Sequence, residues 1–379
     1  MAYKVALKSP RGLCYLSYES ESESKTMKPG KDIHKWVSEL FYENKSPWTS
    51  WIVYNDEPGH ENQNIHHTCQ GHCKGILAWN DSEIGWLIHS VPKFPEYFVP
   101  NSETKTRISL IESSQQKYGQ SFLWLFKRYD NFEECKEFTG NVLKQVLSMS
   151  PLIYLSHGFD MEMMIWKKNP LFEIEKLEWD NGMEHYAKNP HTILDFYETL
   201  ISELSVNLGC KVETWMRGDM VPETEKVKHV QKVSGCFMDE DGEISEYEYD
   251  ETQDHSKWAV SFTSTEKITN IITSSMLKVE IPNTVEYKRT WKKWFESLWC
   301  CCFSKKFRNS VNEHGLILGM TKPVSVAVTE THVDIDTKPK HWILIGDLNR
   351  MHSQWKRGGG GMVIYDEKLW KAMNELIIA

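Results

Sequence analysis

Two His-x-Lys triplets are the residues of this chain whose types and spacing best suit chemistry. His72 and Lys74, and likewise His255 and Lys257, stand directly before an apolar run. Residues i and i+2 of an extended chain point to the same face, so each triplet directs an imidazole and an ammonium toward one spot. Two such pairs facing each other would supply a nucleophile, a general acid and two fixed cations. These groups suit displacement at a phosphodiester and require no metal.

The surroundings of the two triplets repeat as well. Downstream of the first triplet an apolar run ends at His89 and Ser90, and downstream of the second another ends at Asp347 and Asn349. One triplet alone says little, because the chain has 15 His and most of them will be surface or structural residues. Two copies of one layout, a strand with a triplet and then a strand with a polar tip, predict a pseudo-twofold arrangement with the site at its seam.

Six ordered motifs resemble those of deoxyribonuclease II, and the resemblance extends from about Val5 to about Leu376. The motifs are Gly71-His72-Cys73-Lys74-Gly75, His89-Ser90-Val91-Pro92-Lys93-Phe94-Pro95, Tyr118-Gly119-Gln120-Ser121-Phe122-Leu123, Asp254-His255-Ser256-Lys257-Trp258, Gly346-Asp347-Leu348-Asn349-Arg350 and Arg357-Gly358-Gly359-Gly360. The resemblance implies the fold of the phospholipase D superfamily, in which two similar α/β halves, each a β-sheet flanked by helices, pack about a central site. We expect residues 1–150 to form the first half and residues 151–379 to form the second.

The resemblance also implies an activity, which is metal-independent endonucleolytic cleavage of DNA, favoured at acid pH and leaving 3′-phosphate ends. In the mechanism that suits the triplets, His72 attacks phosphorus and forms a phosphohistidine. His255 protonates the departing 5′-oxygen and then activates the water that hydrolyses the intermediate. Lys74 and Lys257 hold the non-bridging oxygens. The two histidines could exchange roles, because the sequence does not distinguish the nucleophile from the acid.

Further site residues follow from the resemblance. Asn349 would hydrogen-bond the phosphate or a catalytic histidine, and Asp347 would orient a histidine or the turn that precedes it. His89 and Ser90 would play the matching part in the first half. Residues in and beside the last two motifs would bind the substrate: Arg350, Lys356, Arg357, Gly358 and Gly359. Glycines there let backbone N–H groups approach a phosphate or form a tight turn, and both interpretations stay open.

The composition bears on the partner. A net charge of −9, from 44 Lys and Arg against 53 Asp and Glu, argues mildly against nucleic acid, yet the local potential in the cleft decides. DNA held through its phosphates would be bound with low base specificity and strong salt dependence. Because the reference pKa of histidine is about 6.5, a site that needs one neutral and one charged histidine predicts a bell-shaped, mildly acid pH profile.

The cysteines and the N-terminus bear on the compartment. The nine cysteines are odd in number, and residues 1–8 contain no apolar run typical of a signal peptide. Both features favour free thiols and a cytoplasmic protein, whereas deoxyribonuclease II proteins are usually lysosomal or secreted. Cys69 and Cys73 have histidines nearby but no second ligand pair, so we expect no metal site and no cofactor. No apolar stretch reaches the ~18 residues of a membrane-spanning helix.

One segment departs from the family. The connection between Lys257 and Gly346 is longer than the family's, which predicts an insertion at roughly 265–340. Its run 291–308 combines aromatic and basic residues with the adjacent cysteines Cys300, Cys301 and Cys302. Such a run could be an acylated segment at a membrane surface, or an ordinary loop or helix at the edge of the domain.

Two other classes of function stay open at this stage. A phospholipase D-like phosphodiesterase at a membrane would use the same chemistry, and only the Trp and Cys cluster of the insertion supports it. A catalytically silent interaction protein could keep the fold, although two intact triplets argue against it. Analogy with the family also allows a homodimer.

Local patterns predict the elements that must position these residues. The β-rich runs 48–54, 75–79 and 120–126 predict strands, and residues 55–59 have the composition of a turn. Asn131 is placed to cap a helix to about residue 147. Thr192, with Asp195 three residues later, predicts a second helix that ends before Gly209, and Asp366 begins a last helix. The result is an α/β chain with its site at strand ends.

Overall fold

The computed structural model describes residues 2–24, 26–42, 47–58, 70–100, 106–159, 174–180, 182–204, 208–215, 218–239, 241–263 and 340–378. The chain divides into two compact units, one of Met1–Thr265 with Ile335–Ala379 and one of Glu266–Asp334. All described residues belong to the first unit. The insertion expected at roughly 265–340, with its cysteine run 300–302, therefore lies almost wholly outside the described residues.

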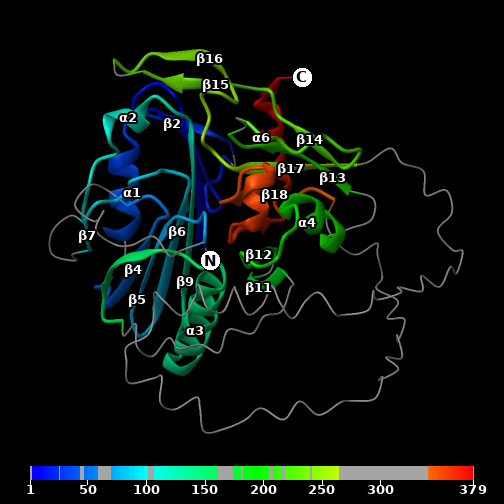
Figure 1. Ribbon diagram of the computed structural model, residues 1–379. Coiled ribbons are helices and arrows are strands. Elements are labelled where there is room, and N and C mark those ends of the chain that lie inside the picture. The colour runs from blue at the N-terminus through cyan, green and yellow to red at the C-terminus, as the bar shows by residue number, and fades with distance from the viewer. Residues whose placement is uncertain are drawn as a thin grey trace, which may run out of the picture. The chain divides into compact units, whose positions relative to one another are not determined.

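Two large β-sheets with few helices make up the described part of the chain, which is therefore a mixed α/β protein, as the sequence predicts (Figure 1). The first sheet has eight strands in the order β10-β4-β5-β6-β9-β1-β2-β3, and every neighbouring pair is antiparallel. Its strands are β1 (Ala2–Lys8), β2 (Tyr15–Glu19), β3 (Lys28–Gly30), β4 (Ser50–Tyr54), β5 (Gly75–Trp79), β6 (Glu83–His89), β9 (Gln120–Arg128) and β10 (Ile153–His157).

The second sheet has seven strands in the order β11-β12-β19-β18-β17-β13-β14, and only its β13–β14 pair is parallel. Its strands are β11 (Ile174–Asp180), β12 (Met183–Lys188), β13 (Leu208–Glu213), β14 (Val227–His229), β17 (Trp258–Thr263), β18 (Ile343–Gly346) and β19 (Gly359–Ile364). Two small sheets complete the described strands: β15 (Lys232–Met238) with β16 (Ile244–Asp250) and β20 (Ile377–Ile378), and β7 (Phe98–Val99) with β8 (Arg107–Ile108).

The helices begin where the sequence supplies caps. Asn131 caps α3 (Phe132–Ser148) by accepting the N–H groups of Glu133 and Glu134, and Asp366 caps α6 (Glu367–Glu375) in the same way. Both helices were predicted. The second predicted helix starts later than expected, because Asp195 rather than Thr192 caps α4 (Phe196–Leu204). The other helices in the described residues are α1 (Ile33–Tyr42), α2 (Ser113–Gln116) and the 3-10 helix η3 (His352–Lys356).

Cores on both faces of the first sheet explain its nearly continuous apolar strands. Every residue of β6 is buried, and its alternate side chains enter two different cores. Leu87 packs with α1 on one face, whereas Trp86 packs on the other face in a core that also contains Ile345 and Met362 of the second sheet. The two sheets therefore share one core, and α4 covers the far face of the second sheet.

Two further features are the state of the described cysteines and the character of the described helices. Among the described cysteines, Cys135, Cys210 and Cys236 are free thiols. None of the helices in the described part of the chain has the length and apolar character that crossing a bilayer demands.

Candidate active site

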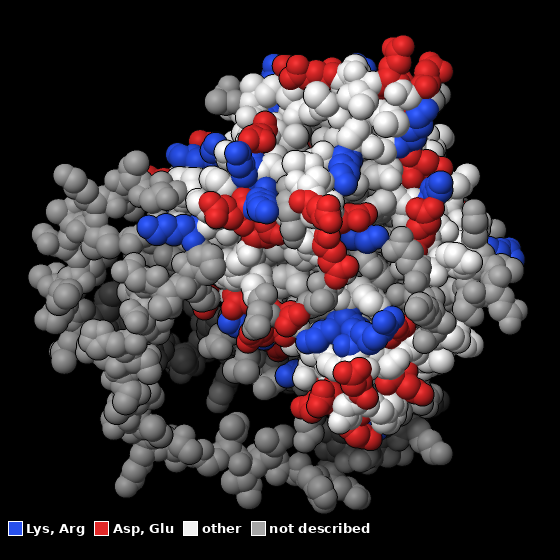
Figure 2. Space-filling model, turned by 180° about the vertical axis from the view of Figure 1, so that it is seen from behind, with Lys and Arg blue, Asp and Glu red and all other residues white. Residues whose placement is uncertain are grey.

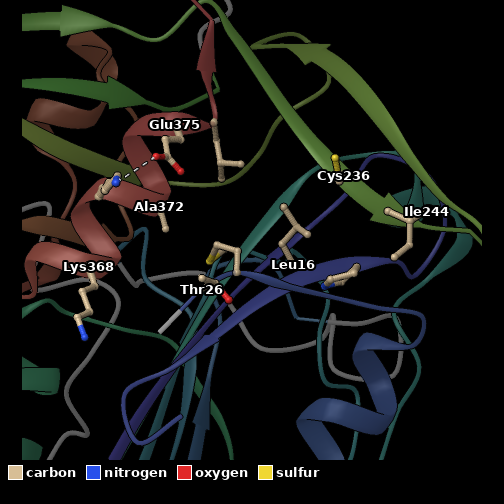
Figure 3. Close-up of a pocket in the computed structure, with 11 residues that line it drawn as sticks. Leu16, Thr26, Cys236, Ile244, Lys368, Ala372 and Glu375 are labelled. Carbon is tan, nitrogen blue, oxygen red and sulfur yellow. Dashed lines mark ion pairs between the residues drawn. The ribbon is translucent and has the colours of Figure 1, made fainter. Parts of the chain in front are cut away.

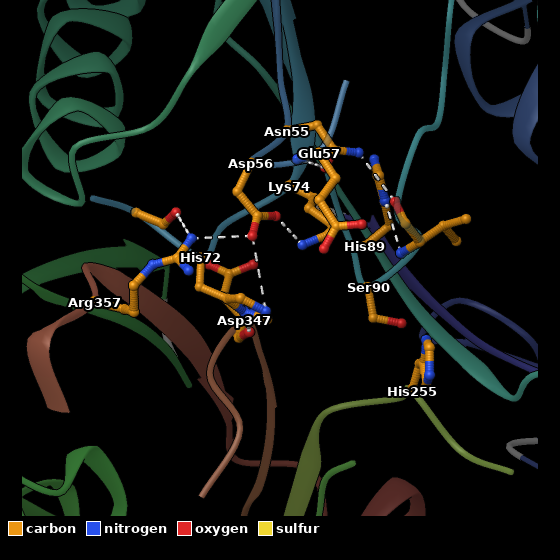
Figure 4. A network of polar contacts seen from close by, with 12 residues as sticks. Asn55, Asp56, Glu57, His72, Lys74, His89, Ser90, His255, Asp347 and Arg357 are labelled. Atoms are coloured by element: carbon orange, nitrogen blue, oxygen red, sulfur yellow. Dashed lines mark hydrogen bonds and ion pairs between the residues drawn. The ribbon is translucent and has the colours of Figure 1, made fainter. Parts of the chain in front are cut away.

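Both His-x-Lys triplets line the same cavity. His72, Lys74, His255 and Lys257 all border a space of about 260 Å³, together with Asn349. Figure 4 shows His72 and Lys74 approaching from one side and His255 from the other. The remaining lining residues are Glu57, Ser90, Pro92, Gln115, Tyr118 and Trp215. The structure thus brings together in one place all five residues that the sequence analysis assigns to catalysis.

The backbone around each triplet is held by the opposite sheet. The N–H of His72 donates to the carbonyl of Gly358 at 2.7 Å, and Gly71 and Gly358 form a parallel β-bridge. The N–H of His255 donates to the carbonyl of Gly119 at 2.9 Å, and a second parallel bridge joins Gly119 to Asp254. Glycine is needed at 119, because a Cβ there would collide with the Asp254 carboxylate.

The ring of His72 is held in one tautomer. Its Nδ1 lies 2.7 Å from the backbone oxygen of Asp347. Because a carbonyl oxygen can only accept a hydrogen bond, Nδ1 carries the proton and Nε2 keeps its lone pair. Burial, followed by the charge of Lys74, lowers the pKa of His72 to about 3. His72 is therefore a neutral imidazole with its Nε2 unprotonated.

His255 lies in a different environment. Its ring packs against Tyr118, with ring centroids 4.1 Å apart and planes inclined by 10°, and against Trp215, with centroids 4.2 Å apart. The two histidines of the cavity therefore have different surroundings, because the ring of His72 is fixed by a hydrogen bond to a backbone oxygen whereas the ring of His255 lies against two aromatic rings.

The two lysines bring positive charge into a buried space. Lys74 forms a short ion pair with the Asp56 carboxylate, and Lys257 donates to the carbonyl of His255 at 2.7 Å. Burial, followed by the charge of Lys74, lowers the pKa of Lys257 to about 7. Burial raises the pKa of Asp347 to about 7, and its Oδ2 lies 3.3 Å from the N–H of Gly360.

The polar residues at the end of β6 and after β18 differ in whether they line the cavity. Asn349 lines the cavity, and its Oδ1 is buried with no hydrogen-bond partner among the described residues. Ser90 also lines it, and its hydroxyl donates to Gln120 Oε1 at 2.6 Å. His89 does not line the cavity, since its ring packs on Phe94 and its Nδ1 accepts the N–H of Val91. Burial lowers the pKa of His89 to about 3, and its Nε2 is buried with no hydrogen-bond partner among the described residues. Its expected role as the counterpart of Asp347 in the first half stays a prediction.

Arg350 does not have the position expected of a substrate-binding residue. Its guanidinium is completely buried and pairs with Asp195 at 3.1 Å and with Glu198 at 3.3 Å. A side chain so enclosed cannot reach a phosphate in the cavity. The adjacent Asn349 points to the cavity instead, so this motif combines one site residue with one structural residue.

The residues before and within β19 also serve mainly to join the sheets. Lys356 is exposed and does not border the cavity. The N–H of Gly358 donates to the carbonyl of Gln70 at 2.9 Å, and Gly359 lies opposite Lys188 in the sheet. These glycines allow close backbone packing and do not offer free N–H groups to a phosphate. Arg357 donates to Asp56 at 3.0 Å and to the carbonyls of Gln70 and Gly71.

Asp56 is a site residue that the sequence analysis missed. It follows β4 in the segment assigned to a turn, and its buried carboxylate contacts Lys74, Arg357 and His72 (Figure 4). The local sequence gives one signal: a carboxylate stands directly after a buried strand. That strand neighbours the strand that follows the first triplet.

A larger cavity of about 590 Å³ lies elsewhere, between β2, the β15–β16 hairpin and α6 (Figure 3). Its walls are mainly apolar, with Leu16, Cys236 and Ile244 on one side and Lys368 and Glu375 of α6 on the other. It contains no histidine and none of the predicted site residues. The smaller cavity is therefore the candidate site, because its lining residues suit catalysis and those of the larger cavity do not.

On the face seen in Figure 2, Lys and Arg side chains are interspersed with Asp and Glu, in contrast to the cavity, where Lys74 and Lys257 lie together. Among the described residues no group of three or more His, Cys, Asp or Glu side chains is arranged to hold a metal ion. Cys69 and its neighbouring histidines lie outside the described residues.

The chain belongs to the deoxyribonuclease II family, whose model matches residues 2–274 and 326–379. Deoxyribonuclease-2-beta of Mus musculus is 29% identical over 56% of this chain and 58% of its own length. Deoxyribonuclease-2 of Caenorhabditis elegans is 23% identical over 92% of this chain and 78% of its own length. The segment that the family model does not match falls within the insertion expected from the sequence.

Proposed function

We propose that this chain is an endodeoxyribonuclease that cleaves DNA phosphodiester bonds through a phosphohistidine, without a metal, and leaves 3′-phosphate ends. The observation that carries the proposal is the convergence of both His-x-Lys triplets and Asn349 on one cavity. Membership of the deoxyribonuclease II family supports DNA as the substrate. Contact through phosphates implies low base specificity and strong salt dependence.

The environments of the two histidines support an assignment of roles. His72 keeps an unprotonated Nε2, which attacks phosphorus while the P–O5′ bond breaks. His255, held against Tyr118 and Trp215, gives its proton to the departing 5′-oxygen. The neutral His255 then takes a proton from water, whose oxygen attacks phosphorus. This second step breaks the bond to His72 and releases the 3′-phosphate.

The remaining groups of the cavity suit charge stabilisation. The ammonium groups of Lys74 and Lys257 would hold the non-bridging oxygens as negative charge develops on them. The amide of Asn349, whose Oδ1 is buried without a partner among the described residues, would orient the phosphate or a catalytic histidine. Asp347 acts through its backbone oxygen, which fixes the tautomer of His72.

The pKa values of the site support an acid optimum. His72 stays neutral into acid solution, because its pKa is lowered to about 3. Lys257 has a pKa lowered to about 7, so its ammonium is lost as the pH rises through neutrality. Activity that needs both forms is favoured between these values, on the acid side of neutral.

We also propose that the two sheets correspond to two similar phospholipase D-like halves, with 1–150 and 151–379 as their approximate bounds. In each, the strand after the triplet pairs with a strand that ends at the site, β5 with β6 and β17 with β18. Strand β10 extends the first sheet to His157. The homodimer, and membrane contact through Cys300, Cys301 and Cys302, stay expectations, and those cysteines lie outside the described residues.

Plasmid nicking in the presence of EDTA tests the proposal. The wild-type protein should convert supercoiled plasmid to open circles, and His72→Ala and His255→Ala should each lose this activity. A phosphodiester lipid offered in parallel separates the alternatives. Turnover of lipid alone would support a membrane phosphodiesterase, and turnover of neither substrate would support a silent interaction protein.

A further inference from the structure

The carboxylate of Asp56 lies close to three basic side chains, those of Lys74, Arg357 and His72. It is buried at the end of β4, where its Oδ1 pairs with Lys74, and its Oδ2 lies 3.0 Å from Arg357 Nη2 and 3.9 Å from His72 Nε2 (Figure 4). Asp56 does not itself border the cavity, whereas His72 and Lys74 do. Its carboxylate therefore contacts two residues that line the cavity without lining it itself.

Arg357 ties this carboxylate to the segment that carries His72. Its Nη2 donates to Asp56 and also to the carbonyl of Gly71 at 2.6 Å, and its Nε donates to the carbonyl of Gln70. One guanidinium thus fixes the Asp56 side chain and the backbone just before His72. Because Arg357 precedes β19 of the second sheet and Asp56 follows β4 of the first, the contact also joins the two sheets.

We propose that Asp56 is a positioning residue of the nuclease site, whose carboxylate orients the Lys74 ammonium toward the phosphate. The inference rests on the proposed function. Buried ammonium groups need a nearby anion to stay charged, and two carboxyl groups are candidates. The pKa of Asp56 is held well below its usual range, despite burial, by Lys74, His72 and Arg357. The pKa of Asp347 is raised to about 7, so Asp56 is the anion that persists in acid solution.

The charge of Asp56 acts on both groups that set the pH profile. The charged groups facing His72 are Lys74, Asp56, Lys257 and Arg357, and those facing Lys257 are Lys74, Asp56, Asp347 and Asp254. In both sets Asp56 raises the pKa. Replacing it by a neutral residue therefore lowers the pKa of His72 and of Lys257 together. Both limbs of the pH profile then move to lower pH.

The test is Asp56→Asn, assayed by kcat and KM for DNA cleavage across the pH range. The shape of the side chain is kept and its charge is lost, so we expect both limbs to move down by about one pH unit. We expect kcat to fall while KM does not rise, because Asp56 does not touch the substrate. The matched control is Asp195→Asn, a buried carboxylate paired with Arg350 outside the cavity, which should lower stability and leave the limbs in place.

Unchanged limbs in Asp56→Asn would overturn the inference even if activity fell. Should this variant not fold, Asp56→Glu keeps the charge and moves the carboxylate by one methylene, so kcat should fall with the limbs unshifted; a wild-type kcat would overturn the positioning role. NMR titration of the Lys257 ammonium in Asp56→Asn gives a readout independent of cleavage, and its pKa should fall below that of the wild type. Failure of the wild type to cleave DNA would instead remove the proposed function.

Discussion

The Nδ1 atom of His72 lies 2.7 Å from the backbone oxygen of Asp347, a residue 275 positions away in the sequence. This hydrogen bond crosses from one sheet to the segment after β18 of the other. It leaves His72 with an unprotonated Nε2, so the two histidines that line the cavity differ before any substrate binds.

A substrate that needs no general acid should separate the two histidines. With the p-nitrophenyl ester of thymidine 3′-phosphate, the leaving group departs without a proton, so His255→Ala should release one equivalent of p-nitrophenolate rapidly and then stall. Mass spectrometry of the quenched protein should find the phosphoryl group on His72. His72→Ala should show no burst. A burst and an adduct in His72→Ala, with neither in His255→Ala, would reverse the assignment.

The alkaline limb should respond to Lys257. Its ammonium is lost as the pH rises through about 7, so the activity that depends on it declines there. Lys257→Arg keeps the positive charge at higher pH, and we expect the alkaline limb of kcat/KM to move upward while the maximal rate falls. Lys356→Arg, an exposed position outside the cavity, is the control. If the alkaline limb of the Lys257→Arg variant did not move, the group that sets this limb would be His255 and not Lys257.

Removing an aromatic contact should weaken His255 as an acid. Trp215→Leu takes away one ring face that favours the imidazolium, and a cation–π contact of about 0.5–2 kcal/mol corresponds to a roughly 2- to 30-fold loss of kcat. The control is Trp51→Leu, which removes a similar stack on His157, 4.3 Å between centroids, away from the cavity. Equal losses in both variants would contradict the role of Trp215.

Arg350 should contribute to stability rather than to DNA binding. Arg350→Met leaves the buried carboxylate of Asp195 without its partner, which we expect to lower the free energy of unfolding by about 3 kcal/mol. Urea denaturation measures this loss, and Lys356→Met should show none. The slope of DNA affinity against salt concentration should be the same as in the wild type. A smaller slope would show that Arg350 does neutralise a phosphate.

Glu213 should destabilise the protein at neutral pH. Both of its carboxyl oxygens are buried with no hydrogen-bond partner among the described residues, and burial raises its pKa well above the usual value. When the pKa of a carboxyl group is higher in the folded state than in the unfolded state, its ionisation opposes folding. The group therefore costs no stability below its unfolded-state pKa, and it lowers the free energy of unfolding as the pH rises above that value. Glu213→Gln should therefore raise Tm at pH 7 but not at pH 4. The exposed Glu248→Gln should change neither value.

The sequence was sufficient where the signal is local. Strand 75–79 and the caps Asn131 and Asp366 lie where the patterns predict, whereas each triplet lies just before its strand and not within it. Each depends on a periodicity or a hydrogen bond within a few residues, so no tertiary information was needed. The start of α4 was misplaced because Thr192 and Asp195 are both good caps, and Asp195 also pairs with Arg350.

The sequence was insufficient where burial decides a role. Arg350 and Asn349 are adjacent, and only the fold turns one into an ion pair and the other toward the cavity. His89 belongs to a site motif, but its ring packs on Phe94 and is not among the residues that line the cavity. Asp56 was missed because its partners Lys74 and Arg357 come from distant segments, and residues 55–59 alone read as a turn.

Each triplet is anchored by a backbone hydrogen bond to the far sheet, His72 to Gly358 and His255 to Gly119. Neither sheet could assemble a working centre by itself, so severing the chain between them should yield two inactive fragments that regain turnover only on reassociation. Heating the intact enzyme should likewise abolish turnover at the same temperature at which the sheets come apart.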